Sequence, residues 1–245
     1  MKITNTQVFG LEGSIIASRY PMMTETPNED DFAHLDKWLQ TILMHEDKTL
    51  EELKEIYGNE FKEEQKFLER AKSLGRARSG SGHNNMLKGI IVQADITASQ
   101  AWWLQQGRYH FSDVVSSQSK MHRLTIMDLD KQCNDWVDRK TIDALERWIE
   151  RLNNFEIYKE EYKTMKLRSG KIVEFTKDNL FQVIINNCPM GLELTARITD
   201  NYLSVKTQYE QRKGHPLYDW ADWSKWAEQL PCFRELTNLN IKGED

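Results

Sequence analysis

The chain has 245 residues, of which 39% are hydrophobic, so it is long enough to bury a substantial core. Its formal charge of −5 at pH 7 argues against a general nucleic-acid-binding protein, but leaves room for a local basic pocket that holds an anion. The three widely separated cysteines, Cys133, Cys188 and Cys232, exclude a disulfide framework and a CxxC metal site. No apolar run reaches the ~18 residues of a membrane helix, and we expect a cytoplasmic protein without a membrane partner.

The first third of the chain predicts a short sheet segment followed by helices. The stretch "TQVFGLEGSIIASRY" predicts one or two short strands that turn at Gly10 and Gly13. Apolar residues at helical spacing predict helices in "DDFAHLDKWLQTILMH" and "EFKEEQKFLERAKSL". The glycine-, serine- and arginine-rich "GRARSGSGHNN" at 75–85 predicts a loop. This loop is either a flexible connector or an anion-binding loop with free backbone N–H groups.

The rest of the chain alternates strand and helix patterns. "MLKGIIVQADIT" predicts a strand, and "TASQAWWLQQG" predicts a helix that Trp102 and Trp103 pack into the core. "KTIDALERWIERLNNFEIYKEEYKTM" predicts a long helix, "LRSGKIVEF" a hairpin-like turn, and "CPMGLELTARITDNYLSVKTQYEQR" another long helix. The fold class is therefore α/β (α+β), with a small central mixed or antiparallel sheet flanked by many helices.

Common catalytic and metal-binding patterns are absent from the sequence. A triad of Ser112, His110 and Asp113 is disfavoured, because side chains so close in sequence rarely point at one reacting atom. The histidines lack HExxH spacing, so no metal site is expected. No P-loop and no GxGxxG after a strand is present, which leaves ordinary ATP and dinucleotide sites without support.

The polar stretch "QQGRYHFSDVVSSQSK" carries the most informative spacing. With Arg108 as the first position, it is similar to the RHRxxSxxxxSxR signature of the flavin-dependent thymidylate synthases, and Lys120 takes the place of the last arginine. Only Arg108 is identical and Lys120 has like charge. The positions of the other signature residues are occupied by Tyr109, His110, Asp113 and Gln118.

The residues before this stretch resemble the family without gaps. Gln105 lies three residues before Arg108, where the family has a glutamine at its nucleotide site. His83 lies twenty-five residues before Arg108 (108 − 83), where the family begins its flavin-binding "HxxxxEH" segment. Lys88 and Gly89 depart from that segment, since the family has glutamate and histidine there.

The C-terminal half resembles the family independently. The family has a Leu-Pro, an asparagine twelve residues later, and then an arginine eleven residues later that binds the uracil nucleotide. Here Pro189, Asn201 (201 − 189 = 12) and Arg212 (212 − 201 = 11) keep both intervals. The N-terminal "GSIIASRY" is similar to the family's first strand and the turn after it, though less specifically.

The resemblance implies a single domain over 1–245, with divergent helical insertions around 28–75 and 130–165, and a homotetramer. It implies FAD as cofactor, NADPH and methylenetetrahydrofolate as co-substrates, and a pyrimidine deoxynucleotide monophosphate as substrate. It gives Gln105 and Arg212 catalytic roles. Flavin binding is assigned to His83, Arg108, Tyr109, His110 and Asn201. Nucleotide binding is assigned to Gln105, Ser116, Ser117, Gln118, Ser119, Lys120 and Arg212.

The chemistry of these residue types agrees with the assignments. Arg212 offers a planar fork for a base edge, and Lys120 with the serines offers charge and donors for a phosphate. Gln105 can both donate and accept at a uracil edge. Loss of the signature histidine and second arginine leaves two alternatives open. One is altered pyrimidine C5 chemistry, and the other is a non-catalytic member of the fold that binds nucleotide or protein.

Overall fold

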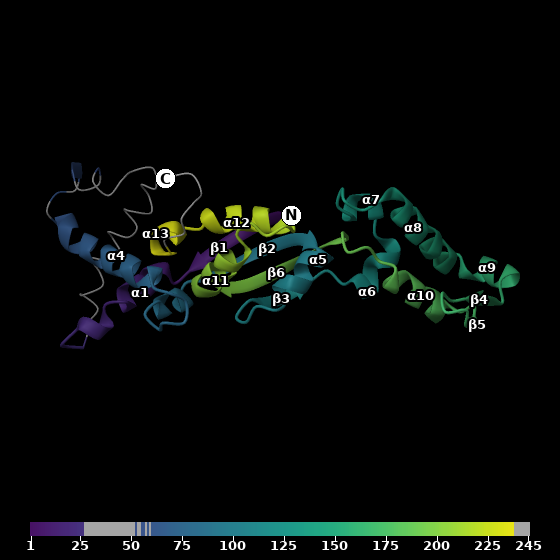
Figure 1. The fold of residues 1–245 in the computed structure, drawn as a ribbon, viewed down its shortest axis with the longest axis horizontal. Coiled ribbons are helices and arrows are strands. Elements are labelled where there is room, and N and C mark those ends of the chain that lie inside the picture. The colour runs from purple at the N-terminus through teal and green to yellow at the C-terminus, as the bar shows by residue number, and fades with distance from the viewer. Residues whose placement is uncertain (27–51, 53–54, 57, 59, 238–245) are drawn as a thin grey trace. The chain divides into compact units, whose positions relative to one another are not determined.

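The computed structural model of the chain describes residues 1–26, 52, 55–56, 58 and 60–237 (Figure 1). The helix expected in "DDFAHLDKWLQTILMH" lies outside these residues. The helices and strands, with short 3-10 helices marked η, are β1 (Lys2–Phe9), α1 (Leu11–Ala17), η1 (Tyr20–Met22), α4 (Glu60–Arg76), η2 (Asn85–Gly89), β2 (Ile91–Ser99), α5 (Gln100–Gln106), β3 (Asp113–Ser117), α6 (Lys120–Arg123), η3 (Leu124–Ile126), α7 (Leu129–Gln132), α8 (Arg139–Asn153), α9 (Phe155–Glu161), β4 (Thr164–Lys166), β5 (Ile172–Glu174), α10 (Lys177–Asn186), β6 (Glu193–Asn201), α11 (Tyr202–Arg212), α12 (Asp219–Glu228) and α13 (Phe233–Thr237).

The chain divides into two compact parts. The first part comprises Met1–Lys2, Ile96–Arg108 and Val115–Arg197, and the second comprises Ile3–Asp95, Tyr109–Val114 and Ile198–Asp245.

The main sheet has four strands in the order β1-β2-β6-β3. Strands β2 and β6 run antiparallel, because Gln93 Nε2 donates to Thr199 Oγ1 at 3.0 Å and, further along β2, the Thr97 and Thr195 hydroxyls lie 2.7 Å apart. Alternate residues of both strands are buried, as period-two patterning requires. Together with the surrounding helices, this small antiparallel sheet confirms the predicted fold class.

Two sequence-based predictions of secondary structure were wrong. The helix expected from Cys188 to Arg212 is a strand followed by a helix, because Ala196, Ile198 and Asp200 are buried at a period of two before α11 begins. The segment "GSIIASRY", compared above with a first strand, lies mostly in helix α1, and the first strand is β1. Gly10 separates the two elements with φ of 72°, and a Cβ there would lie 2.6 Å from the Gly89 carbonyl oxygen.

The predictions for β2, α5 and the β4–β5 hairpin are confirmed, whereas the single long helix expected around 140–165 is confirmed only in part. Strand β2 and helix α5 lie where the sequence indicated, and the Ser99 hydroxyl caps α5 by accepting from the Trp102 N–H. Trp102 is fully buried, whereas Trp103 is half-buried and donates its indole N–H to the Leu194 carbonyl at 2.9 Å. The long helix expected around 140–165 is interrupted at Asn154 into α8 and α9, and the hairpin β4–β5 follows it.

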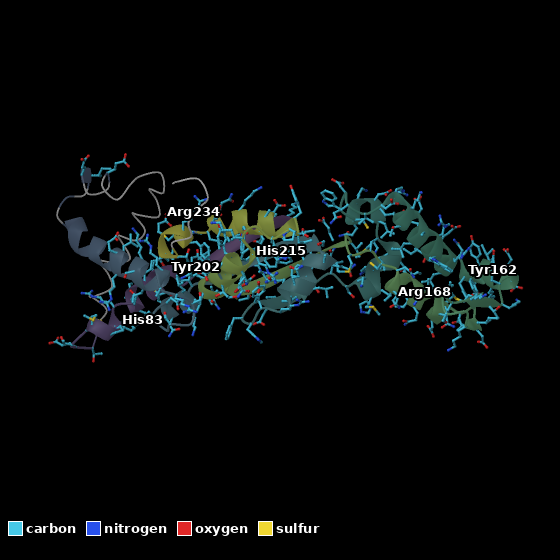
Figure 2. All side chains as sticks on the ribbon, viewed as in Figure 1. His83, Tyr162, Arg168, Tyr202, His215 and Arg234 are labelled. Carbon is cyan, nitrogen blue, oxygen red and sulfur yellow. The ribbon has the colours of Figure 1, made fainter. Side chains whose placement is uncertain are left out.

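Each part has its own apolar packing. In the first part, Figure 1 shows α7, α8, α9, α10 and the β4–β5 hairpin grouped together, and the core there contains Leu124, Leu129, Ile142, Leu145, Ile184 and Leu192. In the second part, α4 packs against α13, and large aromatic side chains are fully or almost fully buried. Tyr202, labelled in Figure 2, packs edge-to-face on Phe233 and donates its hydroxyl to the Pro231 carbonyl at 2.7 Å.

Candidate functional site

Arg212 and Tyr109, two residues assigned to the site from sequence, meet in the second part. Arg212 ends α11, and its Nε donates to the Tyr109 hydroxyl at 2.7 Å. The guanidinium carbon lies 5.5 Å from the Tyr109 ring centre and 5.0 Å from that of Trp220. The two terminal nitrogens have no hydrogen-bond or ion-pair partner among the described residues, so a fixed planar fork is available to a ligand.

Asn201 and His110 lie at the other end of α11. Asn201 Oδ1 accepts from the Ser204 N–H at 3.0 Å and so caps the helix, and the Ser204 hydroxyl donates to the His110 carbonyl at 3.4 Å. The interval of eleven residues between Asn201 and Arg212 is therefore the length of one helix. The helix places these two residues at its opposite ends.

A buried carboxylate lies beside this cap. Asp200 is only 2% exposed, and it accepts from Gln208 Nε2 and from the Asn201 N–H, both at 2.7 Å. Burial raises the pKa of Asp200 to about 6, against the opposing effect of these bonds and of the Ser204 and Ser112 hydroxyls. No feature of the sequence predicted this group, because Asp200 belongs to a segment expected to be helical.

The "GRARSGSGHNN" segment is anchored at its base and exposed at its tip. Buried Lys206 donates to the Gly75 and Ala77 carbonyls at 2.9 and 2.8 Å, and Asn84 Nδ2 also donates to Ala77 at 3.1 Å. His83 is exposed, with its backbone N–H bonded to the Ser81 hydroxyl (Figure 2). No hydrogen bond among the described residues joins His83 to Asn201 or to Tyr109.

The tip of this loop has open backbone and an exposed cation. Gly80 and Gly82 have φ of 87° and 78°, and no described heavy atom lies within 4 Å of a Cβ built on Gly80. Open backbone of this kind lets a pyrophosphate approach the N–H groups. Exposed Arg78 adds a cation without a hydrogen-bond or ion-pair partner among the described residues. Of the two interpretations, these features favour the anion-binding loop.

In the first part, two assigned residues lie at the C-terminal end of α5. Gln105 is half-buried in its last turn, and Arg108 is exposed just beyond it, with its N–H donating to the Gln105 carbonyl at 3.3 Å. The Arg108 guanidinium has no hydrogen-bond or ion-pair partner among the described residues. It is free to bind an anion.

The serine-rich segment borders an open pocket of about 670 Å³ in the first part. The assigned residues Ser117, Gln118 and Ser119 line it, and Ser116 precedes them on the exposed strand β3. Lys120 is not among the lining residues, and its Nζ donates to Gln100 Oε1 at 2.7 Å. The pocket is also lined by His122 and Arg123, which sequence reasoning missed.

The cysteines in the first part are unsuited to nucleophilic attack. Burial raises the pKa of Cys133 to about 11 and also raises that of Cys188, so both remain neutral thiols near pH 7. Among the described residues, no group of three or more histidine, cysteine or acidic side chains is arranged to hold a metal ion. Nor does that part of the chain contain a helix long and apolar enough to cross a membrane.

No family model matches the sequence, and no curated protein matches it. The small antiparallel sheet with its surrounding helices places the chain in the α+β class, and its fold is that of the flavin-dependent thymidylate synthases.

Two crystal structures illustrate this similarity in fold. A structure of flavin-dependent thymidylate synthase ThyX from Helicobacter pylori, complexed with FAD and dUMP, matches with a TM-score of 0.54 and 13% identity, covering 96% of both chains. A second structure of that protein with FAD and dUMP, at 2.31 Å, gives the same TM-score and identity, covering 96% of this chain and 95% of its own. The likeness in fold that the sequence resemblance implied is confirmed.

Proposed function

We propose that this chain is a divergent flavin-dependent thymidylate synthase-like enzyme that transfers a one-carbon unit to C5 of deoxyuridylate or a related pyrimidine nucleotide. The fold supports this, since it matches a protein that holds FAD and dUMP over 96% of both chains. The observation that supports the proposal most directly is the position of Arg212 and the contact that orients its guanidinium. Arg212 keeps its interval from Asn201, and Tyr109 holds its guanidinium with both terminal nitrogens available.

FAD is proposed to bind through the exposed loop tip and through cationic side chains. When bound, the flavin supplies the hydride, and NADPH and methylenetetrahydrofolate supply electrons and carbon. The chain contributes backbone N–H groups around Gly80 and the assigned residues His83 and Arg108 for anionic groups. Tyr109, His110 and Asn201 remain assigned to the flavin by resemblance.

The nucleotide is proposed to be oriented by hydrogen bonds at its base and by cations at its phosphate. Arg212 donates to a carbonyl oxygen of the pyrimidine, which stabilises negative charge that develops on the ring as C5 becomes nucleophilic. Gln105 is assigned to the same base edge, and Ser116 to Lys120 to the phosphate. The neutral thiols of Cys133 and Cys188 agree with chemistry that needs no cysteine nucleophile.

Release of the C5 proton tests the proposed reaction. When a carbon bond forms at C5, the hydrogen there must leave, so protein with FAD, NADPH and methylenetetrahydrofolate is expected to release tritium from C5-labelled deoxyuridylate. Omitting the folate is expected to abolish the release of tritium. Nucleotide binding without any release would instead support the non-catalytic alternative, which the replacement of the signature histidine by Tyr109 motivates.

A cytoplasmic homotetramer is the proposed assembly. Strand β3 lies at the sheet edge with all five residues exposed, including the apolar Val114 and Val115, and an exposed edge strand is suited to pairing with a second copy. Light scattering is expected to give the mass of an oligomer. A monomer at working concentration would contradict this assembly.

A further inference from the structure

The pocket beside β3, α6 and η3 contains positive charge that the family signature does not assign. His122 and Arg123 follow the last signature position, Lys120, and both line the pocket with Ser117, Gln118 and Ser119. None of its lining residues is acidic. All of them belong to the first part of the chain.

Arg123 is the cation best placed to serve this pocket. Its side chain is exposed and makes no hydrogen bond or ion pair with any described residue. Lys120, which the resemblance assigns to phosphate, instead has its Nζ within 2.7 Å of Gln100 Oε1 and does not line the pocket. An unpaired guanidinium beside serine hydroxyls offers the several donors that a phosphate dianion needs.

The pocket is held in shape before any ligand arrives. Gln118 is bound to β6 twice, by its N–H to the Thr195 carbonyl at 2.9 Å and by its Oε1 from the Thr195 N–H at 2.8 Å. The Ser119 oxygen accepts from the His122 N–H at 3.3 Å, and its own hydroxyl hydrogen can still donate. Fully buried Leu124 anchors the segment that follows Arg123.

The remaining wall is apolar. Ile126 is 67% exposed and lines the pocket together with Met127. A cationic end with hydroxyl donors and an apolar wall suits a small phosphomonoester whose body is flat or apolar. A phosphorylated pyrimidine nucleoside has both features.

We infer that this pocket binds the phosphate of the nucleotide, with Arg123 as its principal cation and His122 as a second donor. The inference rests on the proposed function for the identity of the nucleoside, whereas the anion site itself requires only a phosphate ester. It assigns to Arg123 a role that the resemblance gave to Lys120. It adds two residues to the site that no signature position contains.

Calorimetric titration of the full chain tests the inference. The ligands are deoxyuridylate, deoxyuridine and inorganic phosphate, and the variants are Arg123→Ala, Arg123→Lys and His122→Ala. Arg147→Ala, which removes an exposed arginine from α8 in the same part, is the matched control. Arg123→Ala is expected to weaken deoxyuridylate binding about 10- to 100-fold, and Arg123→Lys less. Deoxyuridine binding is expected to stay unchanged, and so is deoxyuridylate binding by the Arg147 control.

The outcomes separate this inference from the proposed function. Wild-type affinity for deoxyuridylate in Arg123→Ala would overturn the inference and leave the proposed function standing. Binding of inorganic phosphate that depends on Arg123, without any binding of nucleotide, would support the anion site and contradict the proposed substrate. If wild-type protein bound neither phosphate nor deoxyuridylate, the inference would be wrong.

Discussion

Arg212→Ala is expected to weaken deoxyuridylate binding by about 10- to 100-fold, because it removes a charge-assisted hydrogen bond of roughly 1.5–3 kcal/mol. The structure explains why one residue has so large an effect. Tyr109 and Trp220 hold the guanidinium, so little rotamer freedom is lost when the ligand binds. Titration with deoxyuridylate, deoxycytidylate and deoxyuridine measures the loss. A similar loss of affinity is expected for deoxyuridine, since Arg212 is proposed to bind the base.

Two further variants separate the contributions of the Arg212 charge, its planar shape and its bond to Tyr109. Arg212→Lys keeps the charge but loses the planar fork, and is expected to bind nearly as weakly as Arg212→Ala. Tyr109→Phe removes only the hydroxyl that accepts from Nε, and is expected to have a smaller effect. The alanine variant also loses its contacts to both rings, about 1 kcal/mol of stability, which is expected to lower Tm by about 2–4 °C. Unchanged affinity in Arg212→Ala would remove this residue from the site.

Asp200→Asn is expected to change the pH dependence of stability. Because burial raises the pKa of Asp200 in the folded chain to about 6, from an ordinary value of 3.8, the folded state binds its proton more tightly than the unfolded state. The stability from this group is therefore fully present below about pH 4 and is lost as pH rises through about 6. A shift of about two pKa units corresponds to roughly 3 kcal/mol. The asparagine variant does not titrate at this position, so its stability does not fall in this pH range for this reason.

Urea unfolding at pH 4.5 and pH 8, at fixed protein concentration, measures this difference. Relative to wild type, Asp200→Asn is expected to gain about 2 kcal/mol in free energy of unfolding between the lower and the higher pH, because part of the loss has already occurred at pH 4.5. Turning the Gln208 amide over would present its Oε1, a buried acceptor without a partner among the described residues, to the carboxamide in place of the Nε2 that now donates to Asp200. Asp113→Asn, at an exposed carboxylate of β3, is the control. An equal effect of Asp200→Asn at both pH values would show that Asp200 does not titrate in this window.

The sequence predicted local structure best where a single pattern dominated. Strand β2 alternates buried and part-buried residues, and Ser99 supplies a capping hydroxyl to α5, so both elements followed from nearby residues. Strand β6 was missed because the segment from Cys188 to Arg212 combines a strand and a helix without glycine or proline between them. The pairing of β6 with β2 and β3, which fixes it as a strand, is a long-range property.

The intervals between the assigned residues follow from the sequence, but the contacts that these residues make do not. The spacing of Asn201 and Arg212 corresponds to one helix, but the bond from Arg212 to Tyr109 joins residues 103 positions apart. Likewise, Lys120 was assigned to phosphate by its position in the signature and by its charge, whereas its bond to Gln100 depends on how α5 and α6 pack. The sequence contained one signal for His122 and Arg123: they are two basic residues shortly after the serine-rich stretch and beyond Lys120, the last signature position.

Titration of the purified full chain with FAD tests the central claim most directly, because flavin binding distinguishes this proposal from every flavin-free use of the fold. We expect saturable quenching of flavin fluorescence together with a rise in Tm. Arg108→Ala is expected to bind FAD more weakly, because it removes an exposed guanidinium that has no hydrogen-bond or ion-pair partner among the described residues. Wild-type protein that neither quenches the fluorescence nor shifts in Tm at saturating FAD would contradict the proposed function.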